Sequence, residues 1–286
     1  MKAKDSGKSG KRFRKVYLVG AGPGNPEYLT VKATKLIKKC DVLLYDRLVS
    51  SEIVELVPST CKKVCVGASH GLEPSLKQEK INELVLKYYS QGKNVVRLKS
   101  GDPFIFGRGG EEIEFLRKNN IPYEVVPGLT SAIAVATAIG IPLTHRDYSS
   151  SLLIISGHRK DSGIENDWDN IAKFGGTIVV LMGVGSSLEI ARNLIERGMS
   201  PLTGVMVIEN GTQKDQRIFA GPLSDLPKIV DKFEVKAPSI IVIGRVINAL
   251  TDNGQITATN LREALENHLD RTILARRSTK DGLKER

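Results

Sequence analysis

Residues 99–112, with the sequence KSGDPFIFGRGGEE, hold the side chains and glycines best suited to binding a ligand. They follow an apolar run, residues 95–98, that is typical of a buried strand. Glycine occurs where the backbone takes a positive φ or lies close to another group, so four glycines in this loop predict a ligand packed against main chain. A tight turn from strand to helix also explains the glycines, but it does not require Arg108.

A second glycine-rich loop, residues 20–26 with the sequence GAGPGNP, also lies between a predicted strand and a predicted helix. Together with Asp46 at the end of the next strand, this loop imitates a dinucleotide-binding fingerprint. However, Asn25 occupies the place of the third glycine, and Pro23 and Pro26 lack the amide protons that bind a pyrophosphate. We therefore expect a loop that fits its ligand by shape, and not a Rossmann dehydrogenase.

The elements that position these loops follow from the hydrophobic pattern. In the first half of the chain, short apolar runs alternate with segments of helical period, which predicts an α/β domain with a mainly parallel sheet and helices on both faces. The second half is richer in strands and predicts a mixed sheet with about two helices. The expected strands are 16–19, 42–45, 64–66, 95–99, 123–126, 152–156, 177–182, 204–209, 217–220 and 239–243. The expected helices are 28–39, 81–89, 111–118, 187–197, 226–233 and 260–275.

The pattern thus predicts two α/β domains between two polar ends. We expect a disordered basic tail over residues 1–15, an N-terminal domain over 16–128, a C-terminal domain over 129–247 and an extension over 248–286.

Charge and composition narrow the classes of function. The net charge is +10, but residues 1–15 carry seven basic residues and one acidic residue, which leaves only +4 for the rest. We therefore expect no track for nucleic acid. No apolar run reaches the roughly 18 residues of a membrane span, and no signal peptide is evident, so a cytoplasmic protein is expected. Three cysteines, with Cys61 and Cys65 lacking a second pair, favour neither a disulfide framework nor a metal site.

Several motifs in one order identify a resemblance. The motifs are VGAGPGNP (19–26), YDRLV (45–49), the glycine-rich loop 101–110, VPGLTSA (126–132), IPLTHR (141–146), SGH (156–158), MG (182–183) and ENGT (209–212). Through these motifs the chain resembles the tetrapyrrole methyltransferases from about residue 16 to residue 246.

The resemblance implies a two-domain homodimer that binds S-adenosylmethionine in a cleft between its domains. It further implies methylation of uroporphyrinogen III at C2 and C7, which gives precorrin-2 for sirohaem or cobalamin. The implied cofactor contacts are Pro23, Ser100, Gly101, Asp102, Ile105, Thr130, Ser131, Met182 and Gly211. A place in the core of a strand explains Met182 equally well.

The implied chemistry assigns roles to charged residues in the same motifs. An electron-rich pyrrole carbon attacks the methyl group and a proton then leaves a bridging carbon, for which Asp46 is the implied acceptor; an aspartate that caps a turn is the alternative. The eight carboxylates of the substrate call for cations, and Arg47, Arg108 and Arg146 are candidates unless they form ordinary surface ion pairs. Phe106 is expected to provide an apolar wall.

One position departs from the family pattern. Where the family often has a lysine with a proposed proton-donor role, this chain has Ala68, so either that role is dispensable or His70 replaces it. The alternatives are a methyltransferase of the same fold with another acceptor (a later corrin intermediate, a translation factor or ribosomal RNA) and a binding module without catalysis.

Overall fold

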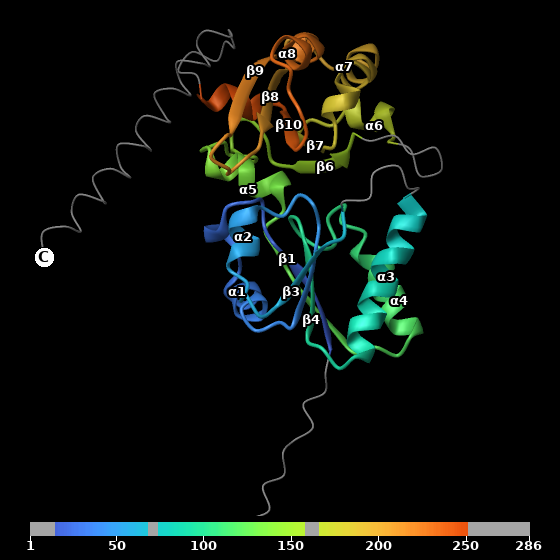
Figure 1. Ribbon diagram of the computed structural model, residues 1–286. Coiled ribbons are helices and arrows are strands. Elements are labelled where there is room, and N and C mark those ends of the chain that lie inside the picture. The colour runs from blue at the N-terminus through green and yellow to red at the C-terminus, as the bar shows by residue number, and fades with distance from the viewer. Residues whose placement is uncertain (1–14, 68–73, 158–165, 251–286) are drawn as a thin grey trace, which may run out of the picture. The chain divides into compact units, whose positions relative to one another are not determined.

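The computed structural model describes residues 15–67, 74–157 and 166–250. The chain divides between Leu129 and Thr130 into two compact units, which we call unit 1 and unit 2 (Figure 1). In the part of the chain that is described, no helix combines the length and the apolar character needed to span a membrane. The expected tail and the expected helix over residues 260–275 lie outside the described residues, apart from Lys15.

Unit 1 contains a parallel sheet of five strands in the order β3-β2-β4-β1-β5. The strands are β1 (Val16–Gly20), β2 (Val42–Tyr45), β3 (Lys62–Cys65), β4 (Val95–Lys99) and β5 (Tyr123–Val126). Mostly apolar runs form β1, β2, β4 and β5, because helices cover both faces of the sheet, whereas the edge strand β3 begins with two exposed lysines. The parallel sheet expected from the sequence is confirmed, and β3 begins two residues earlier than predicted.

Helices pack on the two faces of this sheet in pairs (Figure 1). Helices α1 (Val31–Ile37) and α2 (Ser51–Glu55) cover one face, and α3 (Pro74–Ser90) and α4 (Gly109–Lys118) cover the other. The predicted helix 28–39 is interrupted: a 3-10 turn ends at Tyr28, and α1 begins after Thr30, whose Oγ1 accepts a hydrogen bond from the Ala33 amide at 3.1 Å.

The strand order places the two glycine-rich loops side by side. Strands β1 and β4 are neighbours. After β1 the chain continues to β2, toward one edge of the sheet, and after β4 it continues to β5, at the opposite edge. Open parallel sheets bind their ligands at the carboxyl ends of the strands where the chain direction reverses in this way. The loops at 20–26 and 100–110 follow these two strands.

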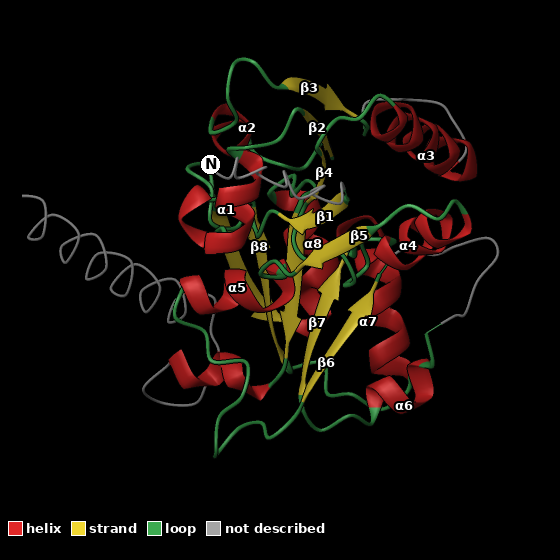
Figure 2. Cartoon of the chain, turned by 90° about the horizontal axis from the view of Figure 1, so that it is seen from below, coloured by secondary structure: helices red, strands yellow, loops and turns green. Residues whose placement is uncertain are grey.

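Unit 2 contains a mixed sheet of five strands in the order β6-β7-β10-β8-β9. Figure 2 shows its first two strands, β6 and β7, side by side. The strands are β6 (Leu152–Ser156), β7 (Thr177–Leu181), β8 (Gly204–Glu209), β9 (Arg217–Pro222) and β10 (Ser239–Ile243). Strand β6 is parallel to β7, and β10 runs antiparallel to both β7 and β8. The carboxyl ends of β6, β7 and β8 therefore lie at one edge.

The helices of unit 2 correct the expectation of about two. Helices α6 (Trp168–Ala172), α7 (Ser187–Glu196) and α8 (Leu226–Lys232) pack on one face of the sheet, and α5 (Ser131–Ala138) packs on the other. Helix α5 is nearly all apolar and gives no helical period, and α6 has only five residues, so neither was predicted. Further 3-10 turns are Val184–Ser186, Leu223–Asp225 and Arg245–Leu250.

Candidate active site

Four glycines bring the loops of unit 1 into direct main-chain contact. A Cβ atom on Gly128 would lie 2.3 Å from the Gly101 carbonyl oxygen and 2.7 Å from the Gly20 Cα atom. Main-chain hydrogen bonds also join Gly22 and Gly101 in both directions, at 3.2 and 2.9 Å. A side chain at Gly20 or Gly128 would clash with backbone atoms, and Gly22 and Gly101 have positive φ values of 74° and 67°, which favour glycine. We call this meeting of the β1, β4 and β5 loops the glycine floor, defined by Gly20, Gly22, Gly101 and Gly128.

Asp102 fastens this floor. One carboxylate oxygen accepts a hydrogen bond from the Phe104 amide at 2.8 Å, and the other accepts from the Gly128 amide at 3.1 Å. The carboxylate thus joins the loop after β4 to the loop after β5. The sequence predicts Asp102 as a cofactor contact, and the structure gives it a role in shaping the site.

Strained backbone is concentrated in the predicted motifs. Left-handed φ values are uncommon for residues other than glycine, cost about 1–3 kcal/mol each and cluster at functional sites. Among the described residues seven that are not glycine have a left-handed φ, and five of these lie in the loop 101–110 or in the motifs around positions 182 and 211. The five are Phe106 (53°), Arg108 (55°), Met182 (56°), Asn210 (48°) and Thr212 (68°).

Apolar side chains are exposed at the same places. Phe104, Ile105 and Phe106 are exposed by 53%, 40% and 47%, and Met182 is exposed by 51%. Grouped exposure of large apolar side chains marks a binding surface. Met182 directly follows β7 and is exposed, so it is not a core residue of a strand, which was the alternative explanation for this methionine.

In unit 2, glycines again allow close packing beside the predicted contacts. A Cβ atom on Gly211 would lie 2.4 Å from Val135 of α5, and one on Gly157 would lie 2.4 Å from the Gly183 Cα atom. Thr130 caps α5, its Oγ1 accepting from the Ala132 amide at 3.4 Å, and Ser131 is the first residue of that helix. These motifs therefore follow β6, β7 and β8 or border the start of α5.

The three predicted arginines are exposed, but they differ in their partners. Arg108 forms a bidentate pair with Glu111, with Nε–Oε1 at 2.9 Å and Nη2–Oε2 at 2.5 Å. This hydrogen bonding raises the pKa of Arg108 above its ordinary value. Arg47 and Arg146 form no ion pair with any other described residue. Pro23 and Ser100 are half-buried.

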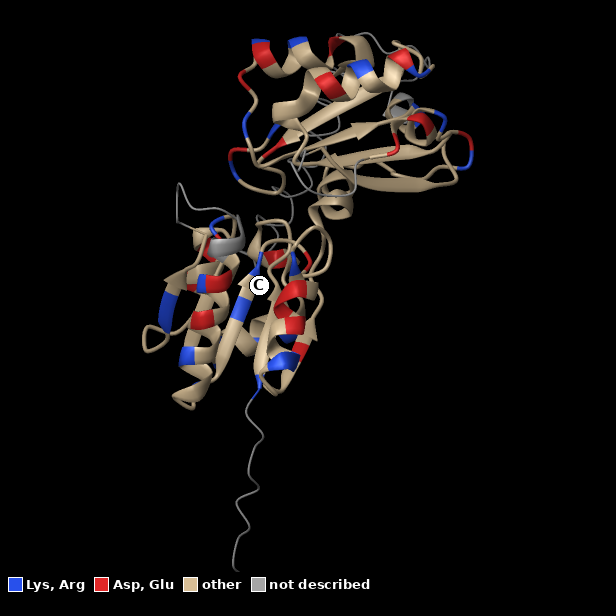
Figure 3. Ribbon diagram, turned by 90° about the vertical axis from the view of Figure 1, so that its right-hand side faces the viewer, with Lys and Arg blue, Asp and Glu red and all other residues tan. Residues whose placement is uncertain are grey.

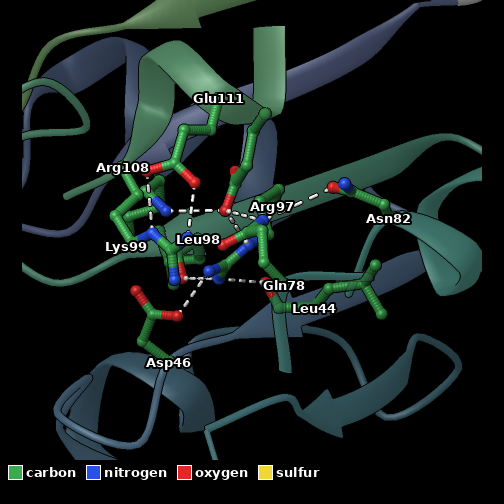
Figure 4. Close-up of polar contacts among 10 residues, drawn as sticks. Leu44, Asp46, Gln78, Asn82, Arg97, Leu98, Lys99, Arg108 and Glu111 are labelled. Carbon is green, nitrogen blue, oxygen red and sulfur yellow. Dashed lines mark hydrogen bonds and ion pairs between the residues drawn. The ribbon is translucent and has the colours of Figure 1, made fainter. Parts of the chain in front are cut away.

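Asp46 directly follows β2 and contacts a buried cation (Figure 4). Its Oδ1 lies 2.5 Å from Nη2 of Arg97. The side chain of Asp46 is 30% exposed, whereas that of Arg97 is 2% exposed. The Asp46 amide also donates to the Leu98 carbonyl at 3.1 Å, and its carbonyl accepts from Val49 at 3.0 Å, as in a turn.

Arg97 belongs to a buried charge network that the sequence did not reveal. Glu112 of α4 accepts with one oxygen, Oε1, from Arg97 Nε at 3.2 Å, Lys99 Nζ at 2.8 Å and Gln78 Nε2 at 3.4 Å. Arg97 and Lys99 share one face of β4 because side chains alternate along a strand. Two cations at alternate positions of an apolar strand are the signal that could have predicted an acidic partner.

The pKa values of the two cations of this network shift in opposite directions, although burial acts to lower both. Burial lowers the pKa of Lys99, aided by the positive charge of Arg97 and opposed by Glu112. Burial alone would also lower the pKa of Arg97, but the carboxylates of Asp46 and Glu112 outweigh it and raise that pKa. Arg97 is therefore a permanent cation beside Asp46.

Ala68 and His70, the two residues considered for the proton-donor role, lie outside the described residues.

The fold and these motifs define the class of protein. The sequence profile of the tetrapyrrole (corrin/porphyrin) methylases matches residues 15–227, well over half of the chain. The chain therefore belongs to the tetrapyrrole methylase family.

Individual relatives sharpen this assignment. The chain is 47% identical over 240 residues to an S-adenosyl-L-methionine-dependent uroporphyrinogen III methyltransferase of Methanosarcina barkeri, covering 82% of this chain and 93% of that protein. It is 46% identical over 232 residues to a siroheme synthase of Nitrosomonas europaea, covering 81% of this chain and 49% of that protein. The chain spans about half the length of the siroheme synthases it matches.

A solved structure also resembles this fold. It is the uroporphyrin-III C-methyl transferase of Thermus thermophilus complexed with S-adenyl homocysteine, with a TM-score of 0.72 and 37% identity over 85% of this chain and 98% of that one.

Proposed function

We propose that this chain transfers methyl groups from S-adenosylmethionine to C2 and C7 of uroporphyrinogen III and so makes precorrin-2, a precursor of sirohaem. The observation that carries the proposal is the 47% identity to a uroporphyrinogen III methyltransferase across 93% of that relative's length. The concentration of strained backbone in the family motifs supports it, because such strain persists where function requires it. The chain is further proposed to be a cytoplasmic homodimer, with cobalamin synthesis as a second use of the product.

The residues present suit S-adenosylmethionine as the methyl donor. This cofactor supplies a methyl group on a positively charged sulfur and carries no phosphates. It therefore needs no helix N-terminus to bind a phosphate, and it can pack against main chain such as the glycine floor. We propose that unit 1 contributes Pro23, Ser100, Gly101, Asp102 and Ile105, and that unit 2 contributes Thr130, Ser131, Met182 and Gly211.

Exposed arginines suit the acidic macrocycle. Arg47, Arg108 and Arg146 are proposed to bind substrate carboxylates, since guanidinium groups bind them in pairs of hydrogen bonds. Arg108 is already paired with Glu111, so a substrate carboxylate has to compete with that residue or share the cation with it. The exposed ring of Phe106 is proposed to contact the apolar part of the macrocycle.

Basic and acidic residues are interspersed on the helices of both units (Figure 3).

Asp46 is the proposed base. After the new carbon–carbon bond forms, the ring must lose a proton from a bridging carbon, and a partly exposed carboxylate at the carboxyl edge of the sheet can accept it. The remaining work of the protein is to align the two reactants, an effect of several orders of magnitude in rate.

The deciding experiment is anaerobic incubation of the protein with S-adenosylmethionine and uroporphyrinogen III, followed by mass spectrometry of the tetrapyrrole. Two added methyl groups per macrocycle are expected, together with two molecules of S-adenosylhomocysteine. No added methyl group, with cofactor binding intact by calorimetry, would show that the acceptor is another molecule or that the chain only binds the cofactor.

A further inference from the structure

The proposed function uses Asp46 but leaves the charges behind it unexplained. The side chains of Arg97, Lys99 and Glu112 are exposed by only 2%, 3% and 5%. Removing charges from water costs more than a buried ion pair usually returns, and apolar residues of similar volume often stabilise a fold equally well. Buried charges beside a proposed catalytic carboxylate are therefore better explained by a role in the reaction than by stability.

Every nitrogen of the Arg97 guanidinium has a fixed partner. Nη2 contacts Asp46 Oδ1 at 2.5 Å, and Nε donates to Glu112 Oε1 at 3.2 Å. Nη1 donates to the Leu98 carbonyl at 3.1 Å and lies 3.5 Å from the Leu44 carbonyl. These partners come from β2, β4 and α4, so the planar group cannot turn without breaking several bonds.

This arrangement constrains only one oxygen of Asp46. Oδ1 is bound by Arg97, and Oδ2 has no hydrogen-bond partner among the residues that the structure describes. A carboxylate with one oxygen bound and the other available has a fixed direction for accepting a proton.

We propose that Arg97 is a positioning residue that holds the Asp46 carboxylate in the orientation needed to accept the proton lost by the macrocycle, and that Glu112 keeps Arg97 in place. This inference rests on the proposed function. It assigns Arg97 no contact with the substrate, so its effect must pass through Asp46.

Arg97→Met tests the proposal by separating turnover from binding. We expect kcat for methyl transfer to fall about 100-fold, the loss typical of a misplaced reactive group, while S-adenosylhomocysteine affinity and substrate KM change by less than roughly threefold. Glu112→Gln should give a smaller fall in kcat. In an Asp46→Asn background Arg97→Met should cause no further fall, since the two residues act as one unit.

Lys99→Met is the matched control. Lys99 is as buried as Arg97 and shares Glu112 with it, but it does not contact Asp46. A role in folding alone predicts similar effects of Arg97→Met and Lys99→Met, whereas a positioning role predicts a much larger fall in kcat for Arg97→Met.

Three outcomes would overturn the proposal: wild-type kcat in Arg97→Met, equal losses in the two variants, or additive losses with Asp46→Asn. If Arg97→Met does not fold, Arg97→Lys is the second variant: it keeps the positive charge but lacks the planar guanidinium group that bonds to several partners at once. Full activity of Arg97→Lys would also overturn the proposal. A wild-type chain that methylates nothing would overturn the proposed function and this inference with it.

Discussion

At the scale of single residues, Asp46 is the side chain whose chemistry is easiest to isolate. Asp46→Asn keeps the size of the side chain and can still bond to Arg97 through its amide oxygen, but it cannot take up a proton at neutral pH. We expect methyl transfer to slow by about 10²–10⁴-fold, the usual contribution of a positioned base. Cofactor affinity, measured by calorimetry, should not change. Unchanged turnover would remove Asp46 from the mechanism.

Arg146 tests the binding of substrate carboxylates without the complication of a protein partner. It is exposed and unpaired among the described residues, whereas Arg108 is paired with Glu111. Losing a charged hydrogen bond costs about 1.5–3 kcal/mol, so Arg146→Met should raise the substrate KM by roughly 10- to 100-fold with little change in kcat. Arg192→Met on the exposed surface of α7 is the control. Equal KM values in the two variants would contradict the carboxylate role.

The motifs predicted Asp46 and Arg146, but the sequence did not identify the pairing of Arg97 with Glu112. The two cations of the apolar run 95–99 call for an acidic partner, but the sequence does not show which acidic residue reaches them. Glu112 lies in the first turn of α4, where acidic residues are common for the helix dipole alone. Only the packing of α4 on β4 reveals that the two residues meet.

At the scale of elements, the glycine floor makes a sharp prediction about stability. Gly128→Ala places a methyl group 2.3 Å from the Gly101 carbonyl oxygen and 2.7 Å from the Gly20 Cα atom. Both are backbone atoms, which cannot relieve the clash by a change of rotamer. We expect a loss of about 1–3 kcal/mol in the free energy of unfolding, measured by urea denaturation. Gly110→Ala is the matched control, because a Cβ atom there meets nothing within 4 Å and alanine favours the helix. Equal stability of the two variants would contradict the packing.

The edge strand β5 gives a prediction about pH. Hydrogen bonds from Lys15 and Lys32 lower the pKa of Glu124 below its ordinary value of about 4.3. The stabilisation from this carboxylate is therefore present above that pH and is lost as the pH falls through the lower, folded pKa. Relative to Glu124→Gln, the wild type should be more stable at pH 7 by less than about 1 kcal/mol.

Urea midpoints at pH 7, 5 and 3 measure this difference, which should shrink toward zero at the lowest pH. A difference that stays constant at every pH would show that the ion pairs contribute nothing.

Helices and strands with a clear hydrophobic pattern were predicted from the sequence, and those without one were missed. The ten strands in the described part of the chain were all predicted near their observed positions, because buried strands give apolar runs bounded by turn residues. Helix α5 was missed because its sequence, SAIAVATA, has no polar face, and α2 and α6 were missed because five residues contain little more than one turn. The glycine-rich loops were predicted as sites, but their packing against one another depends on strand order.

At the scale of the whole molecule, the proposed cofactor contacts are divided between unit 1 and unit 2. Binding of S-adenosylhomocysteine should therefore slow amide hydrogen exchange both in residues 100–106 of unit 1 and in residues 182–183 and 210–212 of unit 2. Bound ligand also stabilises the folded chain by about 2.7 kcal/mol at 100 times its Kd, which a thermal shift detects. Protection confined to one unit would contradict the proposed set of contacts.

The glycine floor has a consequence for changing the selectivity of this chain by mutation. Main-chain atoms present the same chemical groups whatever the sequence, so substitution cannot change the polarity of that surface without displacing a loop. Directed evolution toward a new acceptor should leave Gly20, Gly101 and Gly128 unchanged. Accepted changes should instead accumulate at the exposed side chains proposed to contact the substrate, Phe106, Arg108 and Arg146, where selectivity can shift while the framework stays intact.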